Sequence, residues 1–190
     1  MVGNDVVDLG DPAIAHHHTN ERFVARVCSA GEARRVRSRD DLWTMFAAKE
    51  AAYKALVQLG RSPGFAHRAI VVAADLRSVT WRDCVLSLRV GRDADSVHAV
   101  ARVGDVEPLA RLRLAGETSD QGARTLLLEL AADAVGCDPS RLGIVRDAIG
   151  DSWDGFGPPY VTCSGERVAL DVSLSHDGRF VGVAARLRSP

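Results

Sequence analysis

Three charged side chains, Lys49, Glu50 and Lys54, stand in a stretch of otherwise small and apolar residues, LWTMFAAKEAAYKALVQLG over residues 42–60. Of the 24 basic residues in the chain only two are lysines, and both lie in this stretch. Lysine offers a compact cation whose pKa shifts readily on burial, which arginine does not. A carboxylate between two such cations could bind a metal ion or a charged ligand, whereas an ordinary Glu50–Lys54 helix pair would add only a few tenths of a kcal/mol and leave Lys49 unexplained.

A second carboxylate interrupts the apolar N-terminal stretch MVGNDVVDL, which we expect to form a short strand. Asp5 is either a turn residue beside Gly3 or a ligand directed into a site. Because side chains alternate along a strand, Asp8 points to the opposite face from Asp5 and can join it only if the strand bends or ends at Val7.

The run SLSHDG over residues 173–178 ends one expected strand and turns into the next. Ser175 and His176 could form a hydrolase nucleophile and base, but adjacent strand residues point apart and the chain has no G-x-S-x-G elbow. Hydroxyl and imidazole donors are better suited to contacting a phosphate.

Two arginines, Arg22 and Arg26, share one face of a short helix that we expect over residues 21–28, capped by Asn20. The neighbouring run RRVRSR over residues 34–39 adds four more arginines. Such a face is either a solvated surface or a docking site for an acidic partner.

The elements that must position these side chains alternate in type along the chain. Glu50 and Lys54 share a face of one helix over residues 42–60, begun at Asp40 or Asp41 and ended at Gly60, while Lys49 falls in its apolar stripe. A charge in an apolar stripe costs several kcal/mol unless it is paired or bound. Strands are expected over residues 69–74, 85–90 and 97–103, then a connector over 108–120, a helix over 121–135, and strands over 142–146, 160–163, 168–174 and 180–187.

This order indicates an α+β protein of two similar halves, residues 1–110 and 118–190, joined at residues 108–120. A net charge of -1 argues against a dedicated nucleic-acid binder. The four cysteines show no C-x-x-C spacing, so neither a zinc site nor a disulfide framework is suggested. We expect a cytoplasmic protein, because no stretch matches a signal peptide or a membrane span.

Several of these motifs resemble those of the 4'-phosphopantetheinyl transferase superfamily. GNDVVDL over residues 3–9 looks like its N-terminal G-x-D motif, and FAAKEAAYKA over residues 46–55 looks like its F/W-x-x-K-E-A-x-x-K-A motif. RFVARV over residues 22–27, followed by Glu32, is similar to a segment of the holo-acyl-carrier-protein-synthase branch. GPPY over residues 157–160 and SLSH over residues 173–176 resemble the G-K/R-P and S-x-S-H motifs.

The resemblance implies an enzyme that moves the phosphopantetheine arm of coenzyme A to a serine of an acyl or peptidyl carrier protein. Mg²⁺ would be held by Asp5 and Glu50, with Asp8 as a third ligand. Lys54 would contact the phosphate under attack or help to deprotonate the serine, so Glu50 and Lys54 would be the catalytic residues.

Other residues would serve the two substrates. Ser175 and His176 would bind phosphates of coenzyme A, and Lys49 would neighbour those phosphates. Arg22 and Arg26 would meet the acidic recognition helix of the carrier protein. Pro158 stands where the G-K/R-P motif has a basic residue, which Arg167 or Arg179 could replace.

The length of the chain bears on its assembly. Small synthases of this family form trimers, whereas larger surfactin-type enzymes fuse two similar halves. The two-half plan favours a monomeric pseudo-dimer with one active site between the halves, and a trimer is the alternative. Two other functions stay open: a degenerate homologue that only binds carrier protein or coenzyme A, and a metal-dependent hydrolase of a phosphoanhydride.

Overall fold

The long helix α3, Arg39–Gln58, is the largest element of the N-terminal part of the chain. In the computed structural model, which describes residues 1–61, 67–115, 119–149 and 155–188, it begins three residues earlier than residue 42. The reason is a capping box: the Ser38 hydroxyl accepts from the Asp41 amide at 3.1 Å, and the Asp41 carboxylate accepts from the Ser38 amide at 3.0 Å. Asp41 therefore acts at the third helical position rather than as the cap itself.

A five-stranded antiparallel sheet in the order β1-β5-β4-β3-β2 packs against α3. Its contact with the helix is unusually close, since a Cβ on Gly3 would lie 2.0 Å from the Ala51 carbonyl oxygen. The alanines at positions 47, 48, 51, 52 and 55 are fully buried. Small residues on nearly every side of α3 thus let β1 approach the helix backbone and place Asp5 beside it. The elements of this part are β1 (Val2–Asp8), η1 (Pro12–Ile14), η2 (His17–Thr19), α1 (Glu21–Val27), α2 (Ala30–Ala33), α3, η3 (His67–Ala69), β2 (Val71–Val72), β3 (Ser78–Trp81), β4 (Cys84–Arg92) and β5 (Ser96–Arg102).

The second part of the chain packs a long helix on a three-stranded antiparallel sheet, in the order β10-β11-β6. Residues 109–114, expected as part of a connector, form β6 and pair with β11, while residues 116–118 of that connector lie outside the described residues. A further small sheet, β7-β8-β9, follows the helix. The elements are β6 (Leu109–Leu114), α4 (Ser119–Val135), η4 (Pro139–Arg141), β7 (Leu142–Val145), β8 (Tyr160–Cys163), β9 (Glu166–Arg167), β10 (Leu170–Asp177) and β11 (Phe180–Leu187).

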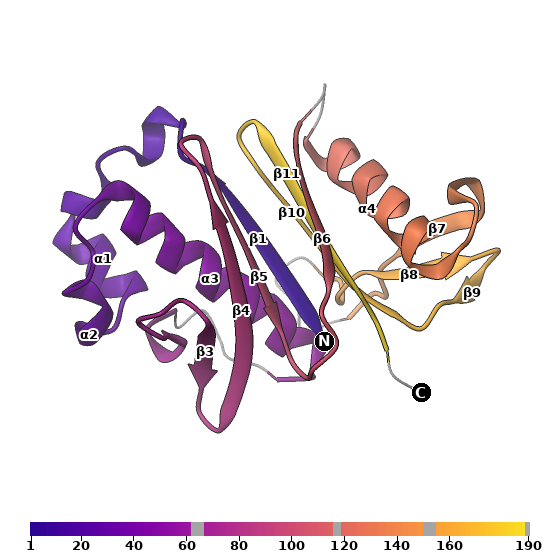
Figure 1. Cartoon of the computed structure of the whole chain (residues 1–190), viewed down its shortest axis with the longest axis horizontal. Helices are drawn as coiled ribbons and strands as arrows, with labels where there is room; N and C mark the ends of the chain where they lie inside the picture. Colours follow the sequence, from indigo (N-terminus) through magenta and orange to yellow (C-terminus); the bar gives the residue numbers. More distant parts are fainter. Residues whose placement is uncertain (62–66, 116–118, 150–154, 189–190) are drawn as a thin grey trace.

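The two parts meet along β1, which lies beside β10 and β11 (Figure 1). In the described sheets, β1 and β10 are not joined by backbone hydrogen bonds. Side chains of β10 instead accept hydrogen bonds from backbone amides of β1. The Asn4 amide donates to Ser173 Oγ at 2.9 Å, and the Asp8 amide donates to an Asp177 carboxylate oxygen at 2.8 Å. These bonds satisfy backbone donors that would otherwise be buried without a partner at the edge of the sheet.

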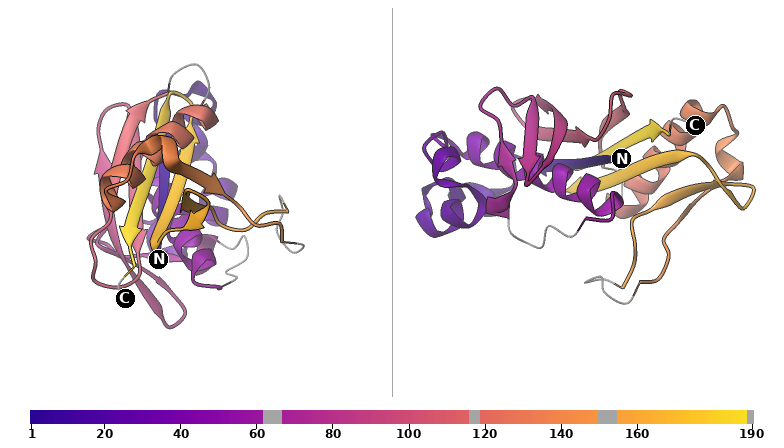
Figure 2. Two further views of the ribbon diagram at one scale, coloured as in Figure 1. Left: turned by 90° about the vertical axis from the view of Figure 1, so that its right-hand side faces the viewer. Right: turned by 90° about the horizontal axis from the view of Figure 1, so that it is seen from below.

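The molecule is elongated, with the α1–α3 end opposite the end formed by α4 and β7–β9 (right-hand view of Figure 2). Each end has its own apolar core, one beneath α3 and one beneath α4. The expectation of an α+β protein with antiparallel sheets and long helices is confirmed. Within the ranges described above, no helix combines the length and apolar character needed to cross a membrane.

Candidate active site

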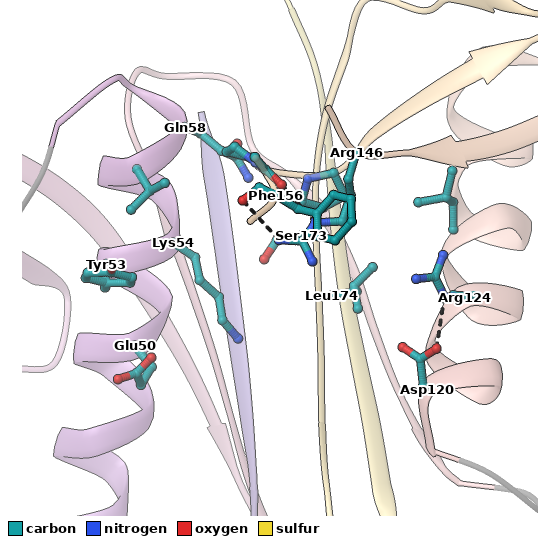
Figure 3. A pocket seen from close by; sticks show the side chains of 15 residues that line it. Glu50, Tyr53, Lys54, Gln58, Asp120, Arg124, Arg146, Phe156, Ser173 and Leu174 are labelled. Carbon is teal, nitrogen blue, oxygen red and sulfur yellow. Dashed lines mark hydrogen bonds and ion pairs between the residues drawn. The ribbon is translucent and has the colours of Figure 1, made fainter. Parts of the chain in front are cut away.

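A pocket of about 460 Å³ opens between the two parts of the molecule. Figure 3 shows Glu50, Tyr53, Lys54 and Gln58 of α3 along one wall and Asp120 and Arg124 of α4 along the other. Ser173 and Leu174 of β10 and the segment with Arg146 and Phe156 lie between them. The pocket is therefore walled by residues from both parts, and two of the expected site residues, Glu50 and Lys54, line it.

Lys54 and Asp5 form an ion pair at the pocket. Lys54 Nζ donates to Asp5 Oδ1 at 2.8 Å and to the Asn4 carbonyl at 3.0 Å. The lysine side chain is 30% exposed and the aspartate side chain 13% exposed, so the cation faces the pocket more than the carboxylate does. The close approach of β1 to α3 brings these two residues together from positions 49 apart in sequence.

Asp5 is held in an environment that resists its ionisation. Burial raises the pKa of its carboxyl to about 6, although the Lys54 ammonium acts in the opposite direction. The nearby carboxylates of Glu50 and Asp177 raise this pKa further. A buried carboxyl close to a second carboxylate indicates a site that favours a cation.

Glu50 interacts with a histidine that sequence reasoning did not single out. The Glu50 carboxylate contacts His67 Nε2, and the His67 ring stacks on Phe46 with centroids 5.3 Å apart. His67 begins η3, a short helix that has no motif of its own in the sequence. Its proximity to Glu50 arises from the fold, so only the structure could reveal it.

The residues at the pocket fit Mg²⁺ as a cation that keeps water or phosphate ligands. Asp5 and Glu50 supply carboxylate oxygens, the hard ligands that Mg²⁺ prefers, and they interact electrostatically. Among the described residues no cluster of three or more His, Cys, Asp or Glu side chains could hold a metal. Two protein carboxylates would thus leave the remaining positions to water and a bound phosphate, as is usual for this ion.

Lys49 is not brought to the pocket. Its side chain is completely buried, and Nζ donates to Glu32 Oε2 at 2.7 Å, to the Ile70 carbonyl at 2.7 Å and to the His67 carbonyl at 3.1 Å. The sequence pattern correctly put Lys49 on the apolar face of the helix. Its charge is compensated there by Glu32 of α2 rather than by a phosphate within the pocket.

Asp8 also lies apart from Asp5. The strand β1 continues through Asp8, so the two side chains point to opposite faces. Asp8 accepts from Arg179 Nη2 at 2.7 Å, Arg179 Nε at 2.9 Å and the Gly10 amide at 2.8 Å. The hydrogen bonds and charge of Arg179 lower the pKa of Asp8 to about 2. Asp8 is therefore paired with Arg179 and does not lie beside Asp5 and Glu50.

Ser175 and His176 point to opposite faces of β10, as neighbours on a strand must. Ser175 is buried and its hydroxyl accepts from the side-chain amide of Asn4 at 3.1 Å, so it faces β1. His176 is exposed and shares a face with Leu174, which lines the pocket. Neither Ser175 nor His176 lines the pocket itself; the β10 residues that do are Ser173, on the Ser175 face, and Leu174, on the His176 face.

The arginines of the pocket differ from those expected to compensate for Pro158. Arg179 is bound to Asp8, and the Arg167 guanidinium lies 4.2 Å from the centre of the Tyr160 ring. Arg124 and Arg146 line the pocket together with Pro158. Arg124 Nε donates to Asp120 at 3.0 Å and Arg146 Nε donates to the Gly157 carbonyl at 2.8 Å. No motif marked these two arginines among the 22 in the sequence.

Arg22 and Arg26 are exposed on α1, which Asn20 caps as expected. They line a surface groove together with Ser29 and Arg68. Arg68 and Ala69 of η3 both line this groove, whereas His67, the first residue of η3, contacts Glu50. We call the surface formed by Arg22, Arg26 and Arg68 the basic groove.

Comparison with known proteins adds one finding. A family model described as ACPS, 4'-phosphopantetheinyl transferase superfamily, matches residues 1–113, which is more than half of the 190-residue chain. The match covers the GNDVVDL and FAAKEAAYKA stretches but ends before GPPY and SLSH. Neither a curated protein nor a solved structure matches the chain.

Proposed function

The chain belongs to the 4'-phosphopantetheinyl transferase superfamily, and from this premise we propose that it transfers the phosphopantetheine arm of coenzyme A to a serine of an acyl or peptidyl carrier protein. The observation that carries the proposal is the pocket lined by Lys54 and Glu50, with Asp5 paired to Lys54 behind it and close enough to Glu50 for the two carboxylates to interact. The arm would leave coenzyme A as a phosphoester on the serine, releasing adenosine 3',5'-bisphosphate.

Asp5 and Glu50 would hold Mg²⁺. When bound, the ion would neutralise charge on the diphosphate of coenzyme A. Asp5 would have to lose its proton to become a ligand, which its environment resists in the free protein. Lys54 already faces the pocket, so its ammonium can donate to the phosphate under attack while it also orients the Asp5 carboxylate.

The second part of the molecule would hold the remainder of coenzyme A. His176 is the residue of the SLSH stretch that we propose as a phosphate contact, because its side chain is exposed and shares a strand face with Leu174, which lines the pocket. The Ser175 hydroxyl would contribute to this binding only by moving away from Asn4, its partner here. Arg124 and Arg146 add positive charge to the pocket wall beside Pro158, where the basic residue of the motif is missing.

The carrier protein would dock at the basic groove. Carrier proteins present an acidic helix, and the groove offers three arginines for it. Because Arg68 is adjacent to His67, and His67 contacts Glu50, a partner bound at the groove would lie beside the pocket. This arrangement supports delivery of the carrier serine to the metal and phosphate site.

We further propose that the two parts are halves of a fused pseudo-dimer that acts as a monomer. Each half has a long helix on an antiparallel sheet, and one pocket uses walls from both. The half with Asp5 and Glu50 comes first in the chain, followed by the half with His176. A trimer in solution, measured by light scattering, would contradict this assembly.

Mass spectrometry of a carrier protein tests the transfer. Incubation with coenzyme A, Mg²⁺ and an apo-carrier should add the mass of the phosphopantetheine arm, and Glu50→Ala should slow this by roughly 10²- to 10⁴-fold. Glu166→Ala, which removes an exposed glutamate on β9, is the matched control and should leave the rate unchanged.

The same assay separates the competing functions. No mass gain on several carriers, or transfer undiminished by Glu50→Ala, would refute the proposal. If carrier protein or coenzyme A still bound, that outcome would indicate a degenerate homologue. Bisphosphate release without any carrier would indicate a phosphoanhydride hydrolase.

A further inference from the structure

Two of the four cysteines, Cys137 and Cys163, meet in the second half although they lie 26 residues apart in sequence. Their Sγ atoms are 2.7 Å apart, closer than unbonded sulfur atoms normally pack. Both side chains are half-buried at the edge of the apolar core beneath α4, so a small molecule can approach them. The other two cysteines, Cys28 and Cys84, belong to the first half and have no such partner among the described residues.

Backbone hydrogen bonds fix both positions independently of the thiols. Cys137 follows the end of α4, where Gly136 adopts a φ of +65° and the Cys137 amide donates to the Ala132 carbonyl at 3.2 Å. Cys163 lies in the middle of a sheet, paired with Leu142 of β7 on one side and Glu166 of β9 on the other. The fold therefore holds the two thiols in contact, which gives each a high effective concentration toward the other.

We propose that Cys137 and Cys163 form a redox modification site, a dithiol that a small-molecule disulfide oxidises to an intramolecular bridge. One thiol loses its proton and attacks the small disulfide, forming a mixed disulfide and releasing one thiolate. The second cysteine then attacks the protein sulfur of this mixed disulfide and expels the other half as a second thiolate. Two protein thiols are oxidised and one small disulfide is reduced to two thiols, so atoms and electrons balance.

The position of the bridge links it to the pocket. Ile144, Arg146 and residues 156–159, which line the pocket, all lie between Cys137 and Cys163 in sequence. Oxidation would close this segment into a covalent loop and restrict its unfolded conformations, which stabilises the folded half. The chemistry of the bridge does not rest on the proposed function, so it can be tested without any activity assay.

The reaction should be slow at neutral pH and faster in alkali. The hydrogen bond between the two thiols raises the pKa of Cys137, with burial acting in the same direction. Only the thiolate attacks, so the rate of bridge formation should increase as the pH rises.

Peptide mapping after oxidation with glutathione disulfide tests the site. The fully reduced protein is oxidised, its remaining thiols are alkylated, and it is digested with trypsin. Residues 125–141 and 147–167 are separate tryptic peptides with one cysteine each, so a bridge joins them into one species that is two hydrogens lighter than their sum. We expect this species, alkylated Cys28 and Cys84, and a melting temperature several degrees higher that returns to its starting value with dithiothreitol.

Cysteine variants separate bridge formation from other reactions of the thiols. Cys137→Ser and Cys163→Ser should each retain glutathione on the remaining cysteine, because the second attack is lost. A Cys28→Ser, Cys84→Ser double variant should still form the bridge. Separate glutathione adducts on Cys137 and Cys163 in the wild-type protein, a bridge between two chains, or an unchanged melting temperature would overturn the proposal.

Discussion

Burial and a neighbouring cation shift the pKa of the Asp5 carboxyl in opposite directions. Lys54 Nζ lies 2.8 Å away and stabilises the ionised form, yet loss of hydration dominates and the pKa of Asp5 is about 6. Placing a carboxylate here is costly for folding, since the charged form is favoured more in the unfolded chain. A cation bound at the pocket would remove this cost, which is consistent with a residue retained for binding rather than for stability.

The raised pKa predicts how the Mg²⁺ requirement depends on pH. Below about pH 6 a proton occupies Asp5 and must leave before the metal binds, whereas above this pH it is absent. The Mg²⁺ concentration that gives half-maximal arm transfer should be constant from pH 8 to pH 7. It should then increase roughly tenfold for each pH unit below the pKa, as expected for one proton exchanged per metal ion.

Transfer rates measured across Mg²⁺ concentrations at each pH check this prediction. Saturating Mg²⁺ should restore much of the rate at pH 5.5. The Lys54→Met variant should show the increase beginning at higher pH, because Lys54 lowers the pKa of Asp5. A half-maximal concentration that is the same at pH 7.5 and pH 5.5 would contradict the assignment of Asp5 as a ligand.

At the scale of elements, a buried ion pair attaches three segments to α3. Lys49 bonds Glu32 of α2 and the carbonyls of His67 and Ile70. Glu32 in turn accepts from the amides of Ser29 and Val72. Burial raises the pKa of Glu32, but these hydrogen bonds outweigh it and hold the pKa below its usual value. The pair thereby fixes η3, which places His67 against Glu50 and Arg68 in the basic groove.

Removing one partner of this pair should be strongly destabilising. Lys49→Met leaves the Glu32 carboxylate buried without its cation, and we expect a loss of roughly 3–5 kcal/mol in the free energy of unfolding. The double variant Lys49→Met, Glu32→Leu should recover part of this loss because no charge remains buried. Urea unfolding of the single and double variants gives the coupling between the two positions.

The same variants distinguish a structural role from a phosphate contact. A Lys49→Met protein with unchanged unfolding free energy and a raised KM for coenzyme A would support the phosphate role that the family resemblance implied. If the ion pair with Glu32 is the main role of Lys49, Glu32→Gln should also lower the free energy of unfolding.

Helices and strands were predictable where caps and periodicity within the same stretch of sequence mark them. Asn20 caps α1 as expected, and β1, β4, β5 and α4 lie close to their expected ranges. Ser38 was missed as the cap of α3 because Asp40 and Asp41 offered nearer candidates, and β6 was missed because its pairing with β11 is a nonlocal property. Periodicity likewise showed that Lys49 is buried but could not identify Glu32, since a partner in another element depends on the tertiary fold.

For the whole molecule, the relation between the groove and the pocket determines how a carrier would be recognised. Replacing both Arg22 and Arg26 by glutamate reverses the charge of the basic groove without touching the pocket. KM for the carrier should increase by one to two orders of magnitude, with kcat and KM for coenzyme A little changed. Steady-state kinetics with each substrate varied in turn measures this, and Arg77→Glu, at an exposed arginine of the same half, serves as the control.

Salt provides an independent check of that prediction. In the wild-type protein KM for the carrier should increase with ionic strength, because exposed charges are screened. In the reversed variant this dependence should weaken or change sign. An equal salt dependence in both proteins would show that the carrier binds elsewhere.

The junction between the halves also contains an ion pair, and it makes the stability of the whole molecule depend on pH. Asp8 of β1 is almost fully buried and bonds Arg179, which lies in the turn between β10 and β11. The pKa of Asp8 is lowered from 3.8 to about 2, so the pair stabilises the folded protein fully above the unfolded pKa, and this contribution is lost as the pH falls from about 4 to 2. Because Arg179 is 52% exposed, we expect about 1 to 2 kcal/mol at neutral pH.

Asp8→Asn should therefore unfold at lower urea concentration than the wild-type protein at pH 7, and the two should converge near pH 2. Asp105→Asn, which changes an exposed aspartate, controls for the altered net charge. Arg179→Met should destabilise by a similar amount, and the double variant should cost less than the sum of the two. A constant difference between Asp8→Asn and wild type at all pH values would show that packing against Gly178, rather than the ion pair, makes Asp8 important at the junction.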